Sequence, residues 1–242
     1  MKNRKQFTLV EILIVIGIVV VLAGMLLGGL NMATGKAENA KAKSEIMNLR
    51  NAIAAFEQEY NKLPKPTGGS KNTFKGKNAD DDPIWIGPKD EDQSSSDQKV
   101  QKDAYKWLIY VLQGKRKSDF SNDDKDLFDD FGDPNTRKKV FLPMQGNDYG
   151  EYKDPWDNDF YIVFEWKYDK GINNKNGVIP GLKASEDSGH DRWIRYNMVI
   201  WSDGSDGKYT KGKDNADWKA SNNEDNIYSL ETQWSDGHTI TR

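Results

Sequence analysis

One stretch of this sequence limits the possible folds more than any other. Ile12–Leu30 is a run of nineteen residues without a charged side chain, and the basic residues Lys2, Arg4 and Lys5 precede it. A helix rises about 1.5 Å per residue, so this run reaches about 28 Å. That length is close to the roughly 30 Å hydrocarbon core of a bilayer. The basic flank predicts a cytoplasmic N-terminus, with the rest of the chain on the other side of the membrane.

Glu11 is the residue that two simple interpretations of this segment leave unexplained. A secretory signal has a shorter apolar region, about 7–15 residues long, followed by a small-x-small cleavage site. Val21-Leu22-Ala23 imitates such a site. Neither a signal peptide nor a plain membrane anchor requires a carboxylate at the edge of the apolar run, where burying an unpaired charge costs about 2.5–3.5 kcal/mol. Glu11 is therefore a candidate functional residue.

The segment Phe7-Thr8-Leu9-Val10-Glu11 stands between a short basic leader and the apolar run. This arrangement resembles the N-terminal motif of the type IV pilin superfamily. The resemblance implies that residues 1–6 are a leader, that a prepilin peptidase cuts between Gln6 and Phe7, and that the new Phe7 amine is methylated. It also implies that Glu11 of one subunit pairs with the Phe7 amine of a neighbour, which removes the cost of burying two charges separately.

Gln6 departs from the family pattern, because glycine usually precedes the cut. A peptidase pocket shaped around glycine is expected to tolerate a side chain poorly. If residues 1–6 are retained, the chain is a membrane-tethered single-pass domain and not a filament subunit.

Helical periodicity continues beyond the apolar run. Apolar side chains recur at steps of three and four residues, as expected for one buried stripe on an amphipathic helix, at Ile46, Leu49, Ile53, Phe56 and Tyr60. Pro64 ends the pattern. The sequence predicts one helix from about Thr8 to Lys62, with a transmembrane and assembly part over residues 7–30 and an amphipathic continuation over 31–63.

The remaining chain predicts a small α+β domain, in which the long helix packs on a small antiparallel sheet. Residues 64–139 are polar and charged and are expected to be a variable loop region, anchored at Ile84–Ile86 and carrying one short helix over 105–112 that ends at Gly114. Its acidic part, 115–139, is interpreted as a solvated loop. Residues 140–242 are expected to form the sheet domain, with a loop over 169–192 and strands at 140–142, 160–166 and 195–201.

Two further motifs resemble segments of the major pseudopilin of type II secretion systems. Asp154–Phe160 resembles the family's D-P-W-G-N-P-Y, with Asp157 in place of glycine and Asp159 in place of proline, and Trp156 is expected in the core. Trp201–Gly207 resembles its S-L-G-x-D-G, and Glu224–Ile227 its D-D-I.

In that family the C-terminal loop wraps a calcium ion. The resemblance implies that Asp206 and Asp225 supply side-chain ligands, that Glu224 adds another, and that Asp203 supplies its backbone carbonyl. Calcium takes about 6–8 oxygen ligands and accepts carbonyls beside carboxylates. The alternative is a flexible tail rich in Asp, Gly and Asn.

Composition narrows the function classes. The net charge of −3, without a basic stripe, predicts no nucleic-acid partner, and the absence of cysteine excludes disulfides and zinc-thiolate sites. No catalytic sequence motif is present, so we expect a non-enzymatic protein.

The resemblance implies a filament subunit of the bacterial inner membrane with a periplasmic soluble domain. The partners it implies are other copies of the chain, the prepilin peptidase, an assembly platform and minor pseudopilins. The alternative is a membrane-tethered binding domain or an adhesion or DNA-uptake pilin.

Overall fold

The computed structural model describes part of the 242-residue chain. For residues 26–32, 84–85, 95–98, 173 and 193–194 it describes the secondary structure but not the side chains. The chain divides into two compact units, Met1–Ala40 and Lys41–Arg242. The described residues are 8–64, 84–87, 95–120, 124–145, 149–165, 172–173, 179, 193–194, 196–208 and 226–229.

Helix α1 (Leu9–Tyr60) has a different character in each unit. In the first unit, the described large apolar side chains between Leu9 and Met25 are 49–80% exposed. Within the part of the chain that the structure describes, no helix combines the length and the apolar character needed to cross a membrane. In the second unit, α1 buries the expected stripe, because Ile46, Leu49, Ile53 and Phe56 are fully buried.

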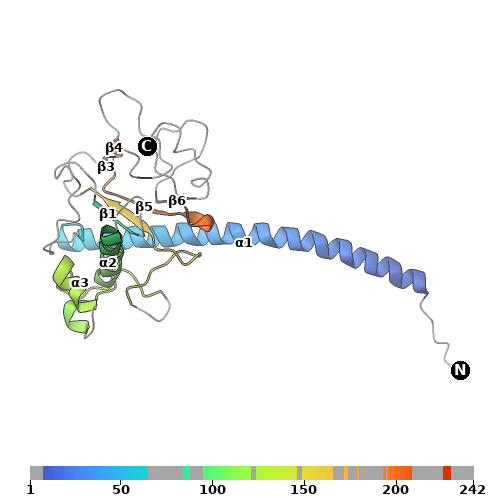
Figure 1. The fold of residues 1–242 in the computed structure, drawn as a ribbon, viewed down its shortest axis with the longest axis horizontal. Helices are drawn as coiled ribbons and strands as arrows, with labels where there is room; N and C mark the ends of the chain where they lie inside the picture. Colours follow the sequence, from blue (N-terminus) through green and yellow to red (C-terminus); the bar gives the residue numbers. More distant parts are fainter. Residues whose placement is uncertain are drawn as a thin grey trace. The chain divides into compact units, whose positions relative to one another are not determined.

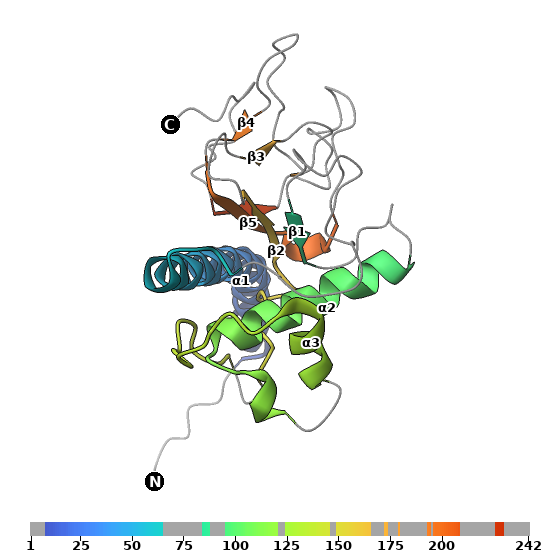
Figure 2. The ribbon, with the colours of Figure 1, turned by 90° about the vertical axis from the view of Figure 1, so that its left-hand side faces the viewer.

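The second unit contains a four-stranded antiparallel sheet in the order β1-β2-β5-β6 (Figure 1). Its strands are β1 (Ile84–Ile86), β2 (Tyr161–Phe164), β5 (Met198–Ser202) and β6 (Ile227–Tyr228). Figure 2 shows α1 and α2 on one side of this sheet, and on the other side the short pair β3 (Ile172–Asn173) and β4 (Trp193–Ile194). The α+β class with a long N-terminal helix is therefore confirmed.

Both faces of the sheet are buried, and alternate residues serve different clusters. Ile162, Phe164 and Ile200 pack with the helices, as part of the main core. Tyr161 and Trp201, which are direct partners across β2 and β5, face a second cluster with ring centroids 5.0 Å apart.

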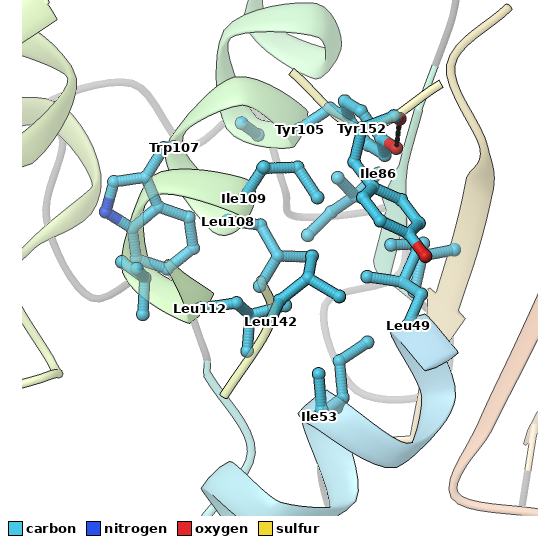
Figure 3. Close-up of a cluster of buried hydrophobic side chains, with 14 of the residues drawn as sticks. Leu49, Ile53, Ile86, Tyr105, Trp107, Leu108, Ile109, Leu112, Leu142 and Tyr152 are labelled. Atoms are coloured by element: carbon cyan, nitrogen blue, oxygen red, sulfur yellow. Dashed lines mark hydrogen bonds between the residues drawn. The ribbon is translucent and has the colours of Figure 1, made fainter. Parts of the chain in front are cut away.

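Helix α2 (Ser95–Leu112) joins α1 to the sheet (Figure 3). Leu108, Ile109 and Leu112 lie close to Leu49 and Ile86 in this core. The Tyr105 hydroxyl donates to the Tyr152 carbonyl at 2.6 Å.

The end of α2 follows the glycine signal in the sequence. Gly114 has φ +76°, and the Lys115 amide bonds back to the Tyr110 carbonyl at 2.9 Å. This is the geometry of a helix that ends at a left-handed glycine. A side chain at Gly114 would also meet the Lys138 carbonyl oxygen at 3.0 Å.

Four local expectations are wrong. Residues 95–103 belong to α2, although their polar sequence predicted a loop.

The acidic segment 115–139 contains the short helix η1 (Lys117–Asp119) and helix α3 (Asp124–Phe131). Helix α3 packs because Leu127, Phe128 and Phe131 give it one apolar face. Residues 140–142 form no strand, since the amides of Phe141 and Leu142 both donate to the Leu112 carbonyl. Strand β3 occupies part of the loop expected over 169–192.

Asn135 holds these helical segments together and is fully buried. Its side-chain amide donates to the carbonyls of Val111 and Lys139, each at 2.7 Å. Its oxygen accepts from the Tyr60 hydroxyl at 2.7 Å and from the Lys139 amide at 3.1 Å. One side chain thus connects α1, α2 and the 135–139 turn.

Replacement of this residue tests whether the connection stabilises the second unit. Asn135→Ala leaves several buried polar groups unpaired, so we expect it to lower the free energy of unfolding by about 2–4 kcal/mol. The exposed Asn51→Ala is the control, with an expected change within about 0.5 kcal/mol. Urea denaturation of the detergent-solubilised chain measures both. Equal stabilities of the two variants would contradict this role.

Candidate functional site

The first candidate site is the start of α1, where the structure describes Thr8 and Glu11. The Glu11 carboxylate accepts hydrogen bonds from the Thr8 amide and the Thr8 hydroxyl, both at 2.8 Å. The Thr8 hydroxyl in turn accepts from the Glu11 amide at 3.3 Å. These reciprocal bonds form a capping box, in which a threonine and a glutamate three residues later satisfy free amides of the first helical turn.

Thr8 is a residue that the sequence interpretation missed. The signal was present, because Thr8-Leu9-Val10-Glu11 fits the Ser/Thr-x-x-Glu capping pattern. Within one subunit, Glu11 therefore has a local partner for its carboxylate. Gln6 and Phe7, the expected processing residues, lie outside the described residues, so the expected pairing of Glu11 with the Phe7 amine stays a prediction.

The second candidate site lies where the two C-terminal motifs meet, and Asp154 is its centre. Asp154 is 5% exposed. One carboxylate oxygen accepts from the amides of Trp156 and Asn158, at 3.0 and 2.8 Å. The other accepts from the Ser202 hydroxyl at 2.6 Å. Asp154 thus connects the turn of the first motif to the start of the second.

The turn itself accommodates the departures from the family motif. Asp157 adopts φ +70°, a left-handed conformation that aspartate tolerates better than most residues, which explains how it stands in a glycine position. Asp159 pairs with Lys153 at 2.7 Å across the base of the turn. Trp156 is half-buried and is not among the buried core residues, so its expected core position is wrong.

The loop after β5 begins with a buried acid and continues to an exposed one. Asp203 is 5% exposed, and its Oδ1 has no hydrogen-bond partner in the described part of the chain. The pKa of Asp203 is raised to about 7, chiefly because the carboxyl is buried; hydrogen bonding to the Tyr161 and Trp201 side chains opposes this rise, and the charges of Asp154 and Asp206 add to it. Asp206 lies in the short helix η2 (Gly204–Asp206), and its carboxylate accepts from the Lys208 amide at 2.8 Å.

Only part of the expected calcium loop can be compared with the structure. Asp203 and Asp206 lie on one short loop, whereas Glu224 and Asp225 are outside the described residues. Among the residues that are described, no three acidic or histidine side chains are grouped as metal ligands. A buried carboxylate oxygen that has no donor among the described residues, in a loop with a second carboxylate, nevertheless fits the oxygen chemistry that calcium requires.

Comparisons with known proteins identified no related protein. No family model matches the chain, and no curated protein or solved structure matches it significantly.

A third buried acid, Glu45 of α1, lies beside this site and is 8% exposed. Its Oε1 accepts from the Gln145 side chain at 3.0 Å, and its Oε2 has no partner within the described residues. Burial raises the pKa of Glu45, the Lys41 charge at 3.8 Å opposes this, and Asp154 adds to it.

This raised pKa gives a direction for pH dependence. The folded state keeps the Glu45 proton at pH values where the unfolded chain, with a pKa of about 4.3, has lost it. Stability therefore falls as pH rises through this window. We expect Glu45→Gln to exceed wild type in stability at neutral pH, with the difference disappearing below about pH 4. Denaturation across pH measures this, with Glu57→Gln as the charge-matched control. A difference independent of pH would contradict it.

The Asp154 connection gives a second prediction for this site. Asp154→Ala leaves the Ser202 hydroxyl and two amides without their acceptor, so we expect a loss of about 2–4 kcal/mol in unfolding free energy. Asp157→Gly, in the same turn, is expected to change stability by less than about 1 kcal/mol, because glycine suits a left-handed conformation. Chemical denaturation of both variants checks the difference, and similar losses would exclude Asp154 as the centre.

Proposed function

We propose that this chain is a structural subunit of a filament of the type II secretion or type IV pilus kind, similar to a major pseudopilin. The observation that supports this most is the combination at the start of α1. There, a carboxylate stands at the edge of the Leu9–Met25 part of the helix, whose described large apolar side chains are all exposed. An apolar surface of this extent needs lipid or other protein to cover it.

The proposal places the uncharged run Ile12–Leu30 in the bacterial inner membrane, as a single span, with the second unit in the periplasm. Positions 26–30 of this run are among those whose side chains are not described. In the filament, the same apolar surface is covered by the α1 helices of other copies. The same part of α1 is therefore proposed to lie in the membrane before assembly and against other α1 helices in the filament.

Glu11 supplies the specificity of assembly in this proposal. Before assembly its carboxylate is held by Thr8, which satisfies part of its hydrogen-bonding capacity. After removal of residues 1–6, the Phe7 amine of a neighbouring subunit gives it an opposite charge. A buried carboxylate gains much more from such a charge than from neutral donors, so the pairing sets the register between subunits.

A calcium ion in the C-terminal loop would crosslink a polar segment that has little apolar surface to order it. The residues proposed to hold it are Asp203 and Asp206, together with Glu224 and Asp225.

The proposed role of the filament is mechanical, because its growth moves exported proteins. The prepilin peptidase, an assembly platform and minor pseudopilins are its proposed partners, and no catalytic activity is proposed.

Gln6 favours a second candidate function. A retained leader leaves no Phe7 amine to pair with Glu11, and the chain then acts as a membrane-tethered binding domain. An adhesion or DNA-uptake pilin is the related alternative if processing occurs in a different system.

Processing is tested by changing the residue before the cut. We expect Gln6→Gly to increase the fraction of chains that lack residues 1–6, because a pocket shaped around glycine accepts it more readily. Intact mass of membrane-extracted protein measures this fraction. Full retention of Met1–Gln6 in both proteins would favour the tethered binding domain.

Assembly is tested with Glu11→Ala in the full-length chain. We expect loss of sheared fibres in electron microscopy while membrane insertion persists, because the variant lacks the charge that pairs with the amine. Glu38→Ala, which removes an exposed acid from the same helix, is the control and should still form fibres. Normal fibres from Glu11→Ala would contradict the proposed function.

A further inference from the structure

Two buried acids of the second unit each have one carboxylate oxygen without a hydrogen-bond partner. They are Glu45 of α1, which is 8% exposed, and Asp203 directly after β5, which is 5% exposed. Oε2 of Glu45 and Oδ1 of Asp203 find no donor within the described residues. A buried charge that is not fully compensated is costly, so such a group normally gains a cation, a further donor or a proton.

Hydrogen bonds connect Glu45 to the turn that contains Asp154. The side-chain amide of Gln145 donates to Glu45 Oε1 and to the Lys153 carbonyl, each at 3.0 Å. The Gln145 oxygen accepts from the Lys153 amide at 2.6 Å. Because Lys153 precedes Asp154 in the chain, one bridging side chain holds Glu45 beside the Asp154 turn.

Asp203 is connected to the same turn from the other side. The Ser202 hydroxyl donates to Asp154 at 2.6 Å and accepts from the Gly204 amide at 3.1 Å. Asp203 stands between Ser202 and Gly204 in the chain. The charge of Asp154 accordingly acts on both Glu45 and Asp203.

Asp154 itself has little room for a proton. One of its oxygens accepts from the amides of Trp156 and Asn158, and the other accepts from the Ser202 hydroxyl. A carboxyl group that only accepts hydrogen bonds is in its ionised form. A fixed negative charge between two other acids disfavours ionisation of each of them.

The other groups around Glu45 compensate its charge weakly. Lys41 Nζ lies 3.8 Å from Glu45 Oε1, and the Lys41 side chain is 63% exposed, so this pair contributes little. The Tyr152 hydroxyl donates to the backbone carbonyl of Glu45 and not to its carboxylate. Burial raises the pKa of Tyr152 to about 12, so this hydroxyl stays neutral.

Asp203 has neutral donors and no cation in the described part of the chain. The side chains of Tyr161 and Trp201 donate hydrogen bonds to it, and Asp206 adds a second charge of the same sign as Asp154. No ion pair found within the described residues includes Asp203. A proton is the simplest compensation for this carboxylate.

We infer that Glu45 and Asp203, on either side of Asp154, form a proton-binding cluster that makes the junction between α1, the 154–158 turn and the loop after β5 sensitive to pH. With both acids protonated, the cluster carries one negative charge. Release of the protons leaves three negative charges in a buried region, and their repulsion loosens the junction. This inference does not depend on the filament proposal.

The direction of the pH effect follows from the two raised pKa values. Burial is the chief cause for both acids, and the pKa of Asp203 reaches about 7. In the unfolded chain, aspartate and glutamate have pKa values of about 3.9 and 4.3. The folded chain therefore binds more protons than the unfolded chain between about pH 4 and pH 7, and stability falls as pH rises through this window.

Urea denaturation from about pH 5 to about pH 8 tests the cluster on the full-length, detergent-solubilised chain in the presence of chelator. Glu45→Gln, Asp203→Asn and the double variant keep the side-chain shape but cannot release a proton. Asp130→Asn, which removes an exposed acid of α3, is the control. Across this range we expect the unfolding equilibrium constant of wild type and of the control to rise at least about tenfold relative to the double variant.

Equal pH profiles for wild type and the double variant would overturn the inference. If the double variant does not fold, the single variants decide, because each should lose part of the pH dependence. A wild-type profile in both single variants would likewise overturn it.

Infrared spectroscopy detects the proton directly. With isotopically labelled aspartate, we expect a protonated-carboxyl band from wild type at about pH 6, where ordinary aspartates are ionised. The band should be absent from Asp203→Asn. Its absence from wild type, or its persistence in Asp203→Asn, would exclude Asp203 as the proton site.

Hydrogen exchange tests the effect on the junction. The amides of Trp156 and Asn158 donate to Asp154, and the Gly204 amide donates to Ser202. After correction for the intrinsic pH dependence of exchange, we expect their protection to fall between about pH 5 and pH 8 in wild type and to stay constant in the double variant. Constant protection in wild type would contradict the proposed loosening.

Discussion

The structure depends on helix α1, whose apolar side chains are buried within the chain in the second unit and exposed in the first. From Lys41 onward the helix has one apolar stripe, and α2 and the sheet cover it within the same chain. Before that point the described large apolar side chains, from Leu9 to Met25, are 49–80% exposed. A helix that is apolar all round is stable in water only when something else surrounds it. This requirement is the basis of the proposal that a membrane, and then other copies of the chain, cover this part of α1.

The candidate sites contain three acidic residues that differ in burial and in hydrogen-bond partners. Glu11 stands at the start of the exposed apolar part of α1, where Thr8 satisfies its carboxylate. Asp154 is buried and fully hydrogen-bonded, so its role is structural. Asp203 is buried and only partly satisfied. The chain thus compensates these three charges to different degrees.

The sequence predicted those features whose signals are local and periodic. The α1 stripe at Ile46–Phe56 and the glycine end of α2 are confirmed, because helical spacing and left-handed glycine require little tertiary context. Helix α3 was missed because most of its residues are charged and only three are apolar. Those three are buried in the folded chain, where α3 packs against α2. The strand expected at 140–142 was wrong, since Leu112 offers its carbonyl to that segment in place of a neighbouring strand. The Asp154–Ser202 contact joins residues 48 positions apart, so no local pattern contains it.

The most direct test of the account is whether the Glu11 carboxylate meets a Phe7 amine from another subunit. Assembled fibres made from a mixture of isotopically labelled and unlabelled subunits are treated with a zero-length carboxyl-to-amine crosslinker and analysed by mass spectrometry. The account predicts a Phe7–Glu11 amide that joins one labelled and one unlabelled chain. A bond found only within single chains, or an N-terminus that still carries residues 1–6, would contradict it.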